Sequence, residues 1–403
     1  MKSKILIGCL FMSFFLFLYM CGCGQKALSA DDVNGRTVIT VNFGKASVFN
    51  SCIAKFNETN PDYYVLNVDY SATDYRETYD TTALRMMTGR GTDIVFLSSD
   101  YRLPQYIEKG ALVDLTPYIE RDIKQEDYLD GAFHLFATED GTYAVPSVLD
   151  INMLLKKCEN NSPYETIPFS KLCDMLEQKR PLSLIARPTL TTLWYIYFFF
   201  PFDVENSEEL TRAIEIAEEY QRSEGEGMEF DRNFLILDFL VSNPENLLAI
   251  YVSFGKLGEN ISGVNEPIII GYPFGISSSS REKEGAWEFI LFLLQEEGQD
   301  AIGMNFAPVR KANFEAMCDQ FFEADDEIRS KECERTGATR EEFLQRYNEM
   351  LQRGRPRELM TNSYDIWRII EEEAQMYYNG DRSVEETVEM IQNRVGLYRK
   401  EKE

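Results

Sequence analysis

Three short polar segments follow predicted strands and carry side chains suited to binding a small polar solute. They occupy residues 44–47, 98–101 and 147–150. In an open α/β sheet, ligands bind beyond the carboxyl ends of the strands, which is where these segments would lie. An ionised aspartate can accept two hydroxyl protons at once, and a hydrogen bond to a charged group contributes on the order of 1.5–3 kcal/mol. The pattern therefore places candidate binding residues in these three segments.

Residue types for catalysis or metal binding are scarce. The chain has one histidine, His134, and no G-x-S-x-G motif, so a hydrolase built on a nucleophile and an imidazole has little to use. Cysteine and histidine show no metal-ligand spacing. A glycosidase with two carboxylates is not excluded by composition, but no acidic pair stands out. We therefore expect no enzyme activity, no metal and no cofactor.

The first residues have the pattern of a secretory signal. Lys2 and Lys4 precede an almost wholly apolar run over residues 5–20, and polar sequence follows. The run is just below the roughly 18 apolar residues of a spanning helix. An uncleaved transmembrane anchor is the alternative. In both cases the body of the protein is expected outside the cytoplasm, held at a membrane surface.

The end of this signal resembles a bacterial lipobox. Gly22 precedes Cys23, as a small residue precedes the cysteine that receives lipid, although Met20 stands where that pattern usually has leucine. Cleavage would remove residues 1–22. Residues 23–36 would then form a lipidated, flexible tether, because they are polar and without a periodic pattern.

Charge narrows the range of partners. The formal net charge is -26, and the predicted signal carries lysines but no acid, so the mature chain is more negative still. A field of this sign repels nucleic acid and anionic membrane faces. It is compatible with a neutral ligand. We expect a monomer without a nucleic-acid partner.

Cysteine usage gives little sign of a disulfide framework. After cleavage and lipidation the body keeps five cysteines: Cys52, Cys158, Cys173, Cys318 and Cys333. An odd count leaves at least one of them unpaired in a monomer. We expect mostly buried thiols, and the alternative is a bridge Cys158–Cys173 or Cys318–Cys333.

Strand and helix patterns alternate in the first part of the chain. Residues 37–43, 65–70 and 93–97 are rich in β-branched and apolar types and predict buried strands, while residues 81–88 predict a helix. Gly110 is placed to cap a further short helix. This alternation predicts βαβ units and a mostly parallel sheet.

The rest of the chain is predicted to be richer in helices. Residues 142–146 and 267–271 predict strands, residues 208–220 predict a helix, and residues 311–403 are almost all helical. Two helix starts carry the capping-box pattern: Ser279 with Glu282, and Ser383 with Glu386.

Five segments form a recognisable set. They are TVITVNFGKASVFNSCIAKFNETNP, GTDIVFLSSDYRLPQYIEKGALVDLTPYI, YAVPSVLDINMLLKK, IIIGYPFGISSSSREKEGAWEFILFLLQEEGQ with APVRK downstream, and IWRIIEEEAQMYYNGDRSVEETVEMIQNRVGLYRKE. In this order they resemble extracellular solute-binding proteins of ABC importers, in the sugar-binding family that includes maltose-binding protein. The resemblance fades between about 156 and 245, where family members usually shape ligand choice.

The resemblance implies a two-lobed, periplasmic-binding-protein-like (type II) α/β fold with a hinge and a helical C-terminal part. Lobe 1 would comprise residues 37–148 plus 268–312, and lobe 2 residues 149–267 plus 313–403, because the chain crosses the hinge more than once. Solute would shift the population toward the closed state through contacts that are absent when the lobes are open.

The resemblance also implies five ligand-binding residues. Lys45 would make a polar contact, Asp100 would accept sugar hydroxyls, and Asp150 would be an acidic contact at the hinge. Trp367 would stack on a sugar ring, and Phe254 is a looser match to a second stacking aromatic. Each has a purely structural alternative: a solvated charge for Lys45, a helix cap for Asp100, a hinge hydrogen bond for Asp150, and a place in the core for Trp367 and Phe254.

The implied partners are a sugar or oligosaccharide and the permease subunits of an ABC transporter. Within the class of binding proteins, a polyamine, a peptide or a metal ion is the alternative ligand. A scaffold that has lost transport and acts as a sensor or surface adhesin is a further alternative.

Overall fold

The structure is a computed structural model that describes most of the chain after residue 32. The described residues are 33–43, 48–68, 75–97, 102–158, 161–177, 189–222, 237–241, 248–249, 251, 261–303, 306–324, 326–356 and 359–402. The signal segment and Cys23 lie outside these ranges, so the expectations for the N-terminal end stay predictions. Within these ranges, no helix is both long enough and apolar enough to cross a membrane.

One large sheet runs through the molecule, and its strands have mixed directions. Its main path is β10 (Ala307–Pro308), β6 (Val145–Lys157), β9 (Ile261–Ile276), β3 (Ile94–Phe96), β1 (Thr37–Val41) and β2 (Tyr63–Asn67). β1 pairs in parallel with β2 and β3, whereas β9 is antiparallel to β3 and β6. The expected α/β class is confirmed. The sheet is mixed rather than mostly parallel because β6 and β9 lie side by side and run in opposite directions.

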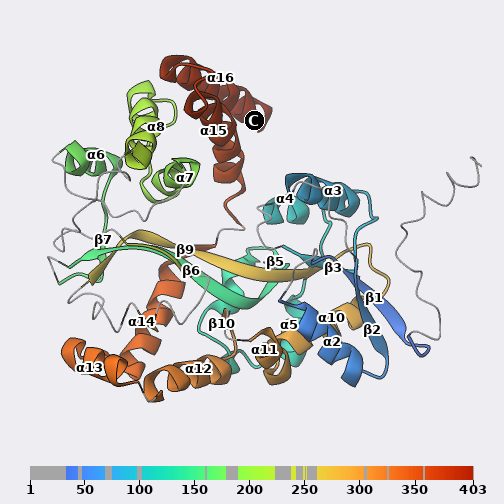
Figure 1. The fold of residues 1–403 in the computed structure, drawn as a ribbon. Coiled ribbons are helices and arrows are strands. Elements are labelled where there is room, and N and C mark those ends of the chain that lie inside the picture. Colours follow the sequence, from blue (N-terminus) through green and yellow to red (C-terminus); the bar gives the residue numbers. More distant parts are fainter. Residues whose placement is uncertain are drawn as a thin grey trace, which may run out of the picture.

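β6 and β9 are the longest strands, and they connect two groups of helices (Figure 1). We refer to them as the crossing strands. At one end β9 pairs with β3. At the other end the two strands pair with β8 (Leu237–Val241), β7 (Tyr164–Glu165) and β11 (Arg355–Pro356). Two irregularities interrupt the register of their shared ladder, between Pro146 and Leu149 and between Asn152 and Leu154. A separate hairpin joins β4 (Ala137–Thr138) to β5 (Gly141–Thr142).

Helices cover both faces of the sheet at the end that holds β1, β2 and β3 (Figure 1). One face carries α2 (Asn50–Thr59), α5 (Thr116–Asp122), α10 (Lys283–Leu294) and α11 (Glu296–Ile302), and the other carries α3 (Tyr75–Met87) and α4 (Leu103–Glu108). Ile94 and Val95 alternate between the two cores, as neighbours on a strand must. Gly110, with φ +63°, follows α4, and its N–H donates to the carbonyl of Ile107 (2.9 Å), which confirms the predicted cap.

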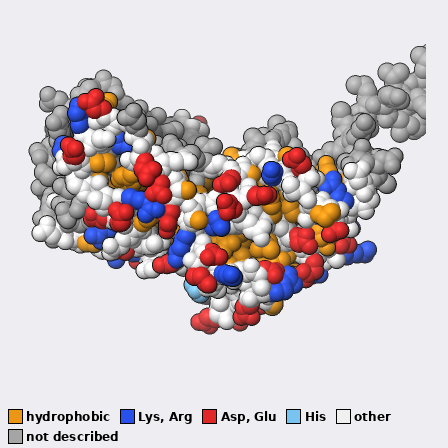
Figure 2. Space-filling view, turned by 90° about the horizontal axis from the view of Figure 1, so that it is seen from below, with side chains coloured by type: hydrophobic (Ala, Val, Ile, Leu, Met, Phe, Trp, Pro, Cys, Tyr) orange, Lys and Arg blue, Asp and Glu red, His pale blue; other side chains and the backbone are white. Residues whose placement is uncertain are grey.

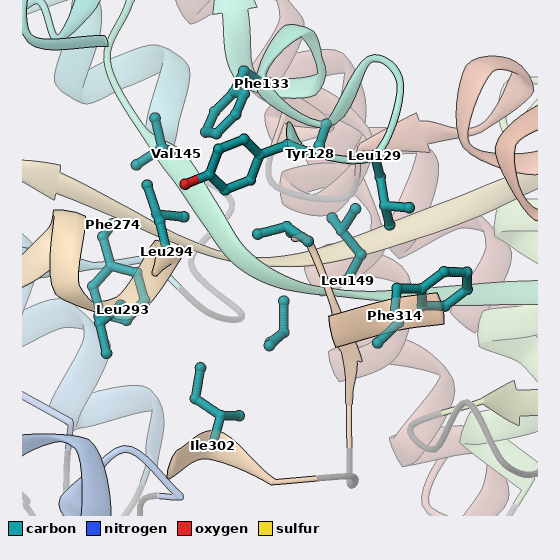
Figure 3. Packing of buried hydrophobic residues seen from close by; sticks show 14 of the residues in the cluster. Tyr128, Leu129, Phe133, Val145, Leu149, Phe274, Leu293, Leu294, Ile302 and Phe314 are labelled. Atoms are coloured by element: carbon teal, nitrogen blue, oxygen red, sulfur yellow. The ribbon is translucent and has the colours of Figure 1, made fainter. Parts of the chain in front are cut away.

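The larger core is built from segments that are far apart in the sequence. Figure 3 shows side chains of β6, α10, α11, α12 and the short 3-10 helix Ala132–Phe136 packing together, among them Phe133, Val145, Leu149, Leu293, Leu294, Ile302 and Phe314. Leu149 and Leu293 are fully buried. Burial of this kind is the main favourable term in folding, so this core fixes the position of the crossing strands.

A second group of helices lies at the opposite end of the crossing strands (Figure 1). It consists of α6 (Phe169–Glu177), α7 (Thr189–Phe199), α8 (Ser207–Arg222), α15 (Thr361–Tyr378) and α16 (Val384–Lys402), which share a separate core. α8 confirms the helix expected over 208–220. The capping box at α16 is also confirmed: Ser383 N–H donates to Glu386 Oε2 (3.1 Å), and Glu386 N–H donates to Ser383 Oγ (3.2 Å).

Three helices follow one another below the crossing strands in Figure 1. They are α12 (Lys311–Glu323), α13 (Glu327–Thr336) and α14 (Arg340–Arg353). Phe314 and Tyr347 join α12 to α14, with ring centroids 4.5 Å apart. Together with α15 and α16 these helices confirm a helical C-terminal part. Residues of α12 and α14 share the larger core with β1 and α10, and the exact lobe boundaries stay a prediction.

The predicted capping box of Ser279 and Glu282 is wrong. α10 begins at Lys283, and its N-cap residue Glu282 makes no side-chain cap hydrogen bond. The Ser280 hydroxyl instead donates to Asp93 Oδ1 (2.7 Å) and accepts from the N–H of Glu282 (3.1 Å). The serine-rich turn is therefore held by a carboxylate next to β3, a partner that a local sequence pattern does not reveal.

The cysteines of the body are free thiols, and neither of the alternative bridges is formed. Cys52 and Cys318 are buried, and burial raises the pKa of each thiol to about 12. On the face that Figure 2 shows, acidic side chains are scattered, with lysines and arginines between them. The net charge of -26 therefore forms no single acidic patch on that face.

Candidate functional site

Two of the predicted binding segments follow strand ends that lie at one edge of the sheet. β1 and β3 pair in parallel, so their carboxyl ends lie at the same edge. Phe43 and Leu97 are the last described residues before segments 44–47 and 98–101. This edge is therefore the place where polar side chains after β1 and β3 can act together.

Six aromatic rings gather at this edge. They are Phe43, Phe49, Phe96, Tyr272, Phe274 and Phe306. Phe43 stacks on Phe49 with centroids 5.0 Å apart, and Phe96 is stacked on Tyr272 at 6.3 Å. Tyr272 also meets Phe306 edge to face at 4.7 Å. We refer to these six residues as the aromatic cluster.

Part of the aromatic cluster stays accessible. Phe96, Tyr272 and Phe306 are half-buried, whereas Phe49 and Phe274 are buried. The N–H of Leu97 donates to the carbonyl of Pro273 (2.9 Å), so the neighbouring Tyr272 lies just beyond the end of β3. The half-buried rings therefore present apolar surface beside the strand ends.

Sequence reasoning missed the aromatic cluster, although one signal was present. Each of the three segments that meet at this edge carries an aromatic residue there: Phe43 after β1, Phe96 at the end of β3, and Tyr272 within β9, directly after the apolar run 267–271. A single aromatic residue at a strand end is an ordinary core residue. These three residues form a cluster only because their strands are neighbours in the sheet, and that neighbourhood is set by pairing between distant parts of the chain.

Asp150 lies on the crossing strand β6, opposite Ile270 of β9. The residue is only 4% exposed. The Tyr272 hydroxyl donates to Asp150 Oδ2 across 3.4 Å, a long hydrogen bond. A carboxylate and the half-buried ring of Tyr272 are therefore in direct contact where the chain crosses between the two groups of helices.

Tyr347 of α14 also interacts electrostatically with Asp150. Tyr347 is 1% exposed. Burial, and after it the negative charge of Asp150, raises the pKa of the Tyr347 hydroxyl well above its usual range. Tyr347 therefore lies close enough to the carboxylate of Asp150 for the two groups to interact.

Trp367 lies in the second core rather than beside Asp150. It is 3% exposed, and its ring lies 5.9 Å from Tyr197 and 6.2 Å from Phe198, both of α7. Its stacking role stays a prediction. Lys45, Asp100 and Phe254 lie outside the described residues, so their roles stay predictions too.

Groups for catalysis do not converge in the part of the chain that the structure describes. His134 is exposed in the 3-10 helix Ala132–Phe136. Within the described ranges, no three histidine, cysteine, aspartate or glutamate residues are grouped to hold a metal ion. The arrangement that is described, a buried carboxylate beside half-buried rings, can bind a solute.

The fold is that of solved two-lobed solute-binding proteins. An ABC transporter solute-binding protein from Thermotoga lettingae, bound with α-D-tagatose, has a TM-score of 0.52 and 15% identity, covering 89% of this chain and 98% of that one. An ABC substrate-binding protein from Listeria monocytogenes in complex with cycloalternan has a TM-score of 0.52 and 15% identity, covering 90% and 99%. A maltose-bound protein from T. maritima has a TM-score of 0.51 and 15% identity, covering 90% and 100%.

The family comparison agrees with this class. Residues 42–155 match the family of bacterial extracellular solute-binding proteins. A comparison with curated proteins finds no match. The resemblance expected from the sequence is confirmed: the chain resembles extracellular solute-binding proteins in sequence over residues 42–155 and in fold over most of its length. The matched stretch contains Phe43, Phe96 and Asp150.

Proposed function

We propose that this chain is an extracytoplasmic solute-binding protein that captures a sugar or oligosaccharide between two lobes and delivers it to an ABC permease. The observation that carries the proposal is the fold it shares with three solute-binding proteins solved with tagatose, cycloalternan and maltose. The match of residues 42–155 to the solute-binding family supports it. The lobes are formed by residues 37–148 plus 268–312 and by 149–267 plus 313–403.

The chemistry of the candidate site suits a neutral polyol. Asp100 and Asp150 accept hydroxyl protons of the solute, and Lys45 adds a polar contact. The half-buried ring of Tyr272 lies beside Asp150 and meets the ring of Phe306, and these rings can cover the apolar side of a sugar ring. A carboxylate that accepts hydroxyls next to an aromatic face discriminates the orientation of those hydroxyls. Trp367 and Phe254 are the proposed contacts from the second lobe.

The protein releases the solute without altering it chemically, since the matched family is one of binding proteins. A polyamine or a basic peptide is the second candidate ligand. The observation in its favour is the net charge of -26, because carboxylates attract a polycation over long distances.

Thermal melting against a panel of sugars tests the proposal. At least one sugar should raise the melting midpoint, because a ligand that binds only the native state adds RT ln(1 + [L]/Kd), about 2.7 kcal/mol at a hundredfold excess over Kd. Asp100→Ala should abolish the shift without lowering the midpoint of the free protein. Asp140→Ala, on an exposed turn, is the matched control and should keep the shift.

Two outcomes of this experiment, and a separate incubation of the protein with oligosaccharides, discriminate between the alternatives. A midpoint raised by spermidine or a basic peptide, and by no sugar, would replace the proposed ligand by the second candidate. Full retention of the sugar shift in Asp100→Ala would contradict the proposed site. Recovery of cleaved oligosaccharide would mean that the protein is an enzyme.

We also propose that Cys23 carries the lipid that holds the protein at the membrane. Cys23→Ser should move the expressed protein from the membrane fraction to the soluble fraction and abolish incorporation of labelled palmitate, because acyl chains supply the anchoring energy. Cys21→Ser is the control and should stay labelled. A Cys23→Ser protein that stays in the membrane fraction would favour the uncleaved anchor over residues 5–20.

A further inference from the structure

A cavity of about 350 Å³ lies where β9 meets the ends of α7 and α14. None of its lining residues belongs to the candidate sugar site. Its wall includes two arginines, one glutamate and two buried apolar side chains: Arg353, Arg355, Glu266, Ile167 and Phe199. The volume falls within the range of roughly 300–1,000 Å³ that is typical of small-molecule sites.

Arg353, the last residue of α14, provides a cation on the wall of this cavity. Its guanidinium lies 4.4 Å from the centroid of the Tyr164 ring. Glu349, one turn earlier on the same helix, pairs with Arg346 at 2.7 Å instead. Among the residues that the structure describes, Arg353 pairs with no carboxylate. In a chain with a net charge of -26, an unpaired arginine on a cavity wall is a feature that an anion can use.

Arg355 and Glu266 form the polar rim of the cavity. Arg355 Nε lies 3.2 Å from Glu266 Oε2, and Arg355 Nη2 donates to the carbonyl of Phe198 (3.0 Å). Arg355 is thereby fixed in position, with its charge balanced by Glu266. The three charged groups together leave one net positive charge, so the rim attracts an anion and can neutralise one negative charge on it.

The backbone that carries Glu266 is held in an unusual conformation. Asn265 has φ +59°, in the left-handed region, inside the strand β9. Its side chain accepts from the N–H of Ile167 (2.8 Å) and donates to the carbonyls of Ile167 (3.1 Å) and Phe199 (2.6 Å). The register of β9 against β6 shifts at this point, so the segment forms a bulge. Such strain persists only where the surroundings fix it, and it concentrates at functional sites.

The floor of the cavity is apolar. Ile167 and Phe199 are each 1% exposed and lie beneath it, and the exposed prolines Pro168 and Pro201 add accessible apolar surface to its wall. A ligand that fills the cavity therefore needs an apolar body as well as a charged group. A guanidinium offers parallel N–H donors that match a carboxylate.

We infer that this cavity is a second binding site, which takes a small organic monocarboxylate with an apolar body. The carboxylate pairs with Arg353, the apolar body lies on Pro168 and Pro201 above Ile167 and Phe199, and Glu266 reduces the attraction for anions. The site goes beyond the proposed sugar function, because it shares no residue with it.

Calorimetric titration of the mature protein with benzoate tests this inference. Benzoate should bind, whereas benzyl alcohol, which has the same ring without the charge, and inorganic phosphate, which has the charge without the ring, should bind at least about tenfold more weakly. Arg353→Gln should weaken benzoate by at least about tenfold. Arg335→Gln is the matched control, because Arg335 is exposed on α13 and pairs with Glu332.

A second variant moves the affinity in the opposite direction. Glu266→Gln removes the negative charge of the rim, so benzoate should bind more tightly and phosphate should begin to bind. This arm does not depend on the effect of Arg353→Gln on folding. Equal affinity for benzoate in Arg353→Gln and in Arg335→Gln would overturn the inference, as would weaker binding in Glu266→Gln or equal binding of benzyl alcohol.

Discussion

Replacing Trp287 by alanine should lower the free energy of unfolding by about 3–5 kcal/mol, the range for removing a large buried ring. Trp287 lies on α10 and is 1% exposed. Its indole N–H donates to Asp122 Oδ2 (2.7 Å), and its ring packs 5.3 Å from Tyr118. The substitution therefore opens a cavity between α5 and α10 and also removes a hydrogen bond. Urea unfolding followed by circular dichroism measures the loss.

Trp287→Phe separates the two contributions. It keeps most of the buried ring and loses the indole N–H, while Asp122 stays paired with Arg121 at 2.8 Å. The loss should then be about 1 kcal/mol, the net value of a hydrogen bond. An alanine variant that is no less stable than the phenylalanine variant would show that burial of the ring does not hold α10 in place.

Replacing Glu373 by glutamine should lower the free energy of unfolding by about 3 kcal/mol, the scale for breaking a buried ion pair from one side. The Glu373 side chain is 10% exposed on α15. It accepts hydrogen bonds from Arg394 Nη1 (2.7 Å) and from Arg382. Glutamine keeps the shape but leaves two guanidinium groups without this partner. Glu372→Gln is the matched control: its side chain is 38% exposed, so a change below about 1 kcal/mol is expected.

The contribution of Glu373 should depend on pH. Burial opposes ionisation of this carboxyl, but the hydrogen bonds from Arg394 and Arg382 outweigh it and hold its pKa below its usual value. A group whose pKa is lower in the folded state stabilises the protein above its unfolded pKa, about 4.3 for glutamate. The stabilisation is lost as the pH falls through the folded pKa. The difference in stability between the wild type and Glu373→Gln should therefore be full at neutral pH and shrink in acid. A difference that stays constant down to about pH 3 would contradict this account.

Helices, strands and caps could be predicted from the sequence where interactions between nearby residues determine them. β1, β3, α8 and the capping box of Ser383 and Glu386 are set by apolar spacing and by side chains within a few residues of each other. The turn before α10 is not, because Ser280 is held by Asp93, nearly two hundred positions away in the chain. The residues Ser279 and Glu282 have the types that a capping box requires, but they do not bond to each other as a capping box would.

The crossing strands are a second case in which contacts between distant residues limit what the sequence can predict. The sequence predicts strands over 142–146 and 267–271, whereas β6 begins only at Val145 and runs to Lys157, and β9 extends beyond 267–271 at both ends. Asp150 on β6 and Asn265 on β9 interrupt the apolar pattern. Asp150 Oδ2 accepts from Tyr272, and Asn265 bonds to the segments that contain Ile167 and Phe199. Partners that come from distant parts of the chain cannot be read from a local window.

The candidate site was accessible to sequence reasoning in part. The rule that ligands bind at strand ends located the edge of β1 and β3, and the resemblance singled out Asp150. The aromatic cluster was not accessible, because Tyr272 meets Phe96 only after β9 has paired with β3, and Phe306 joins the cluster through Tyr272.

The crossing strands also determine how this chain can be divided. The larger core draws on residues before and after the stretch that builds most of the second core. A protease that cuts β6 or β9 would therefore not release a half able to fold by itself. A fluorescent reporter inserted to turn the protein into a sensor belongs in an exposed hairpin tip such as 139–140, and not at a junction between the halves.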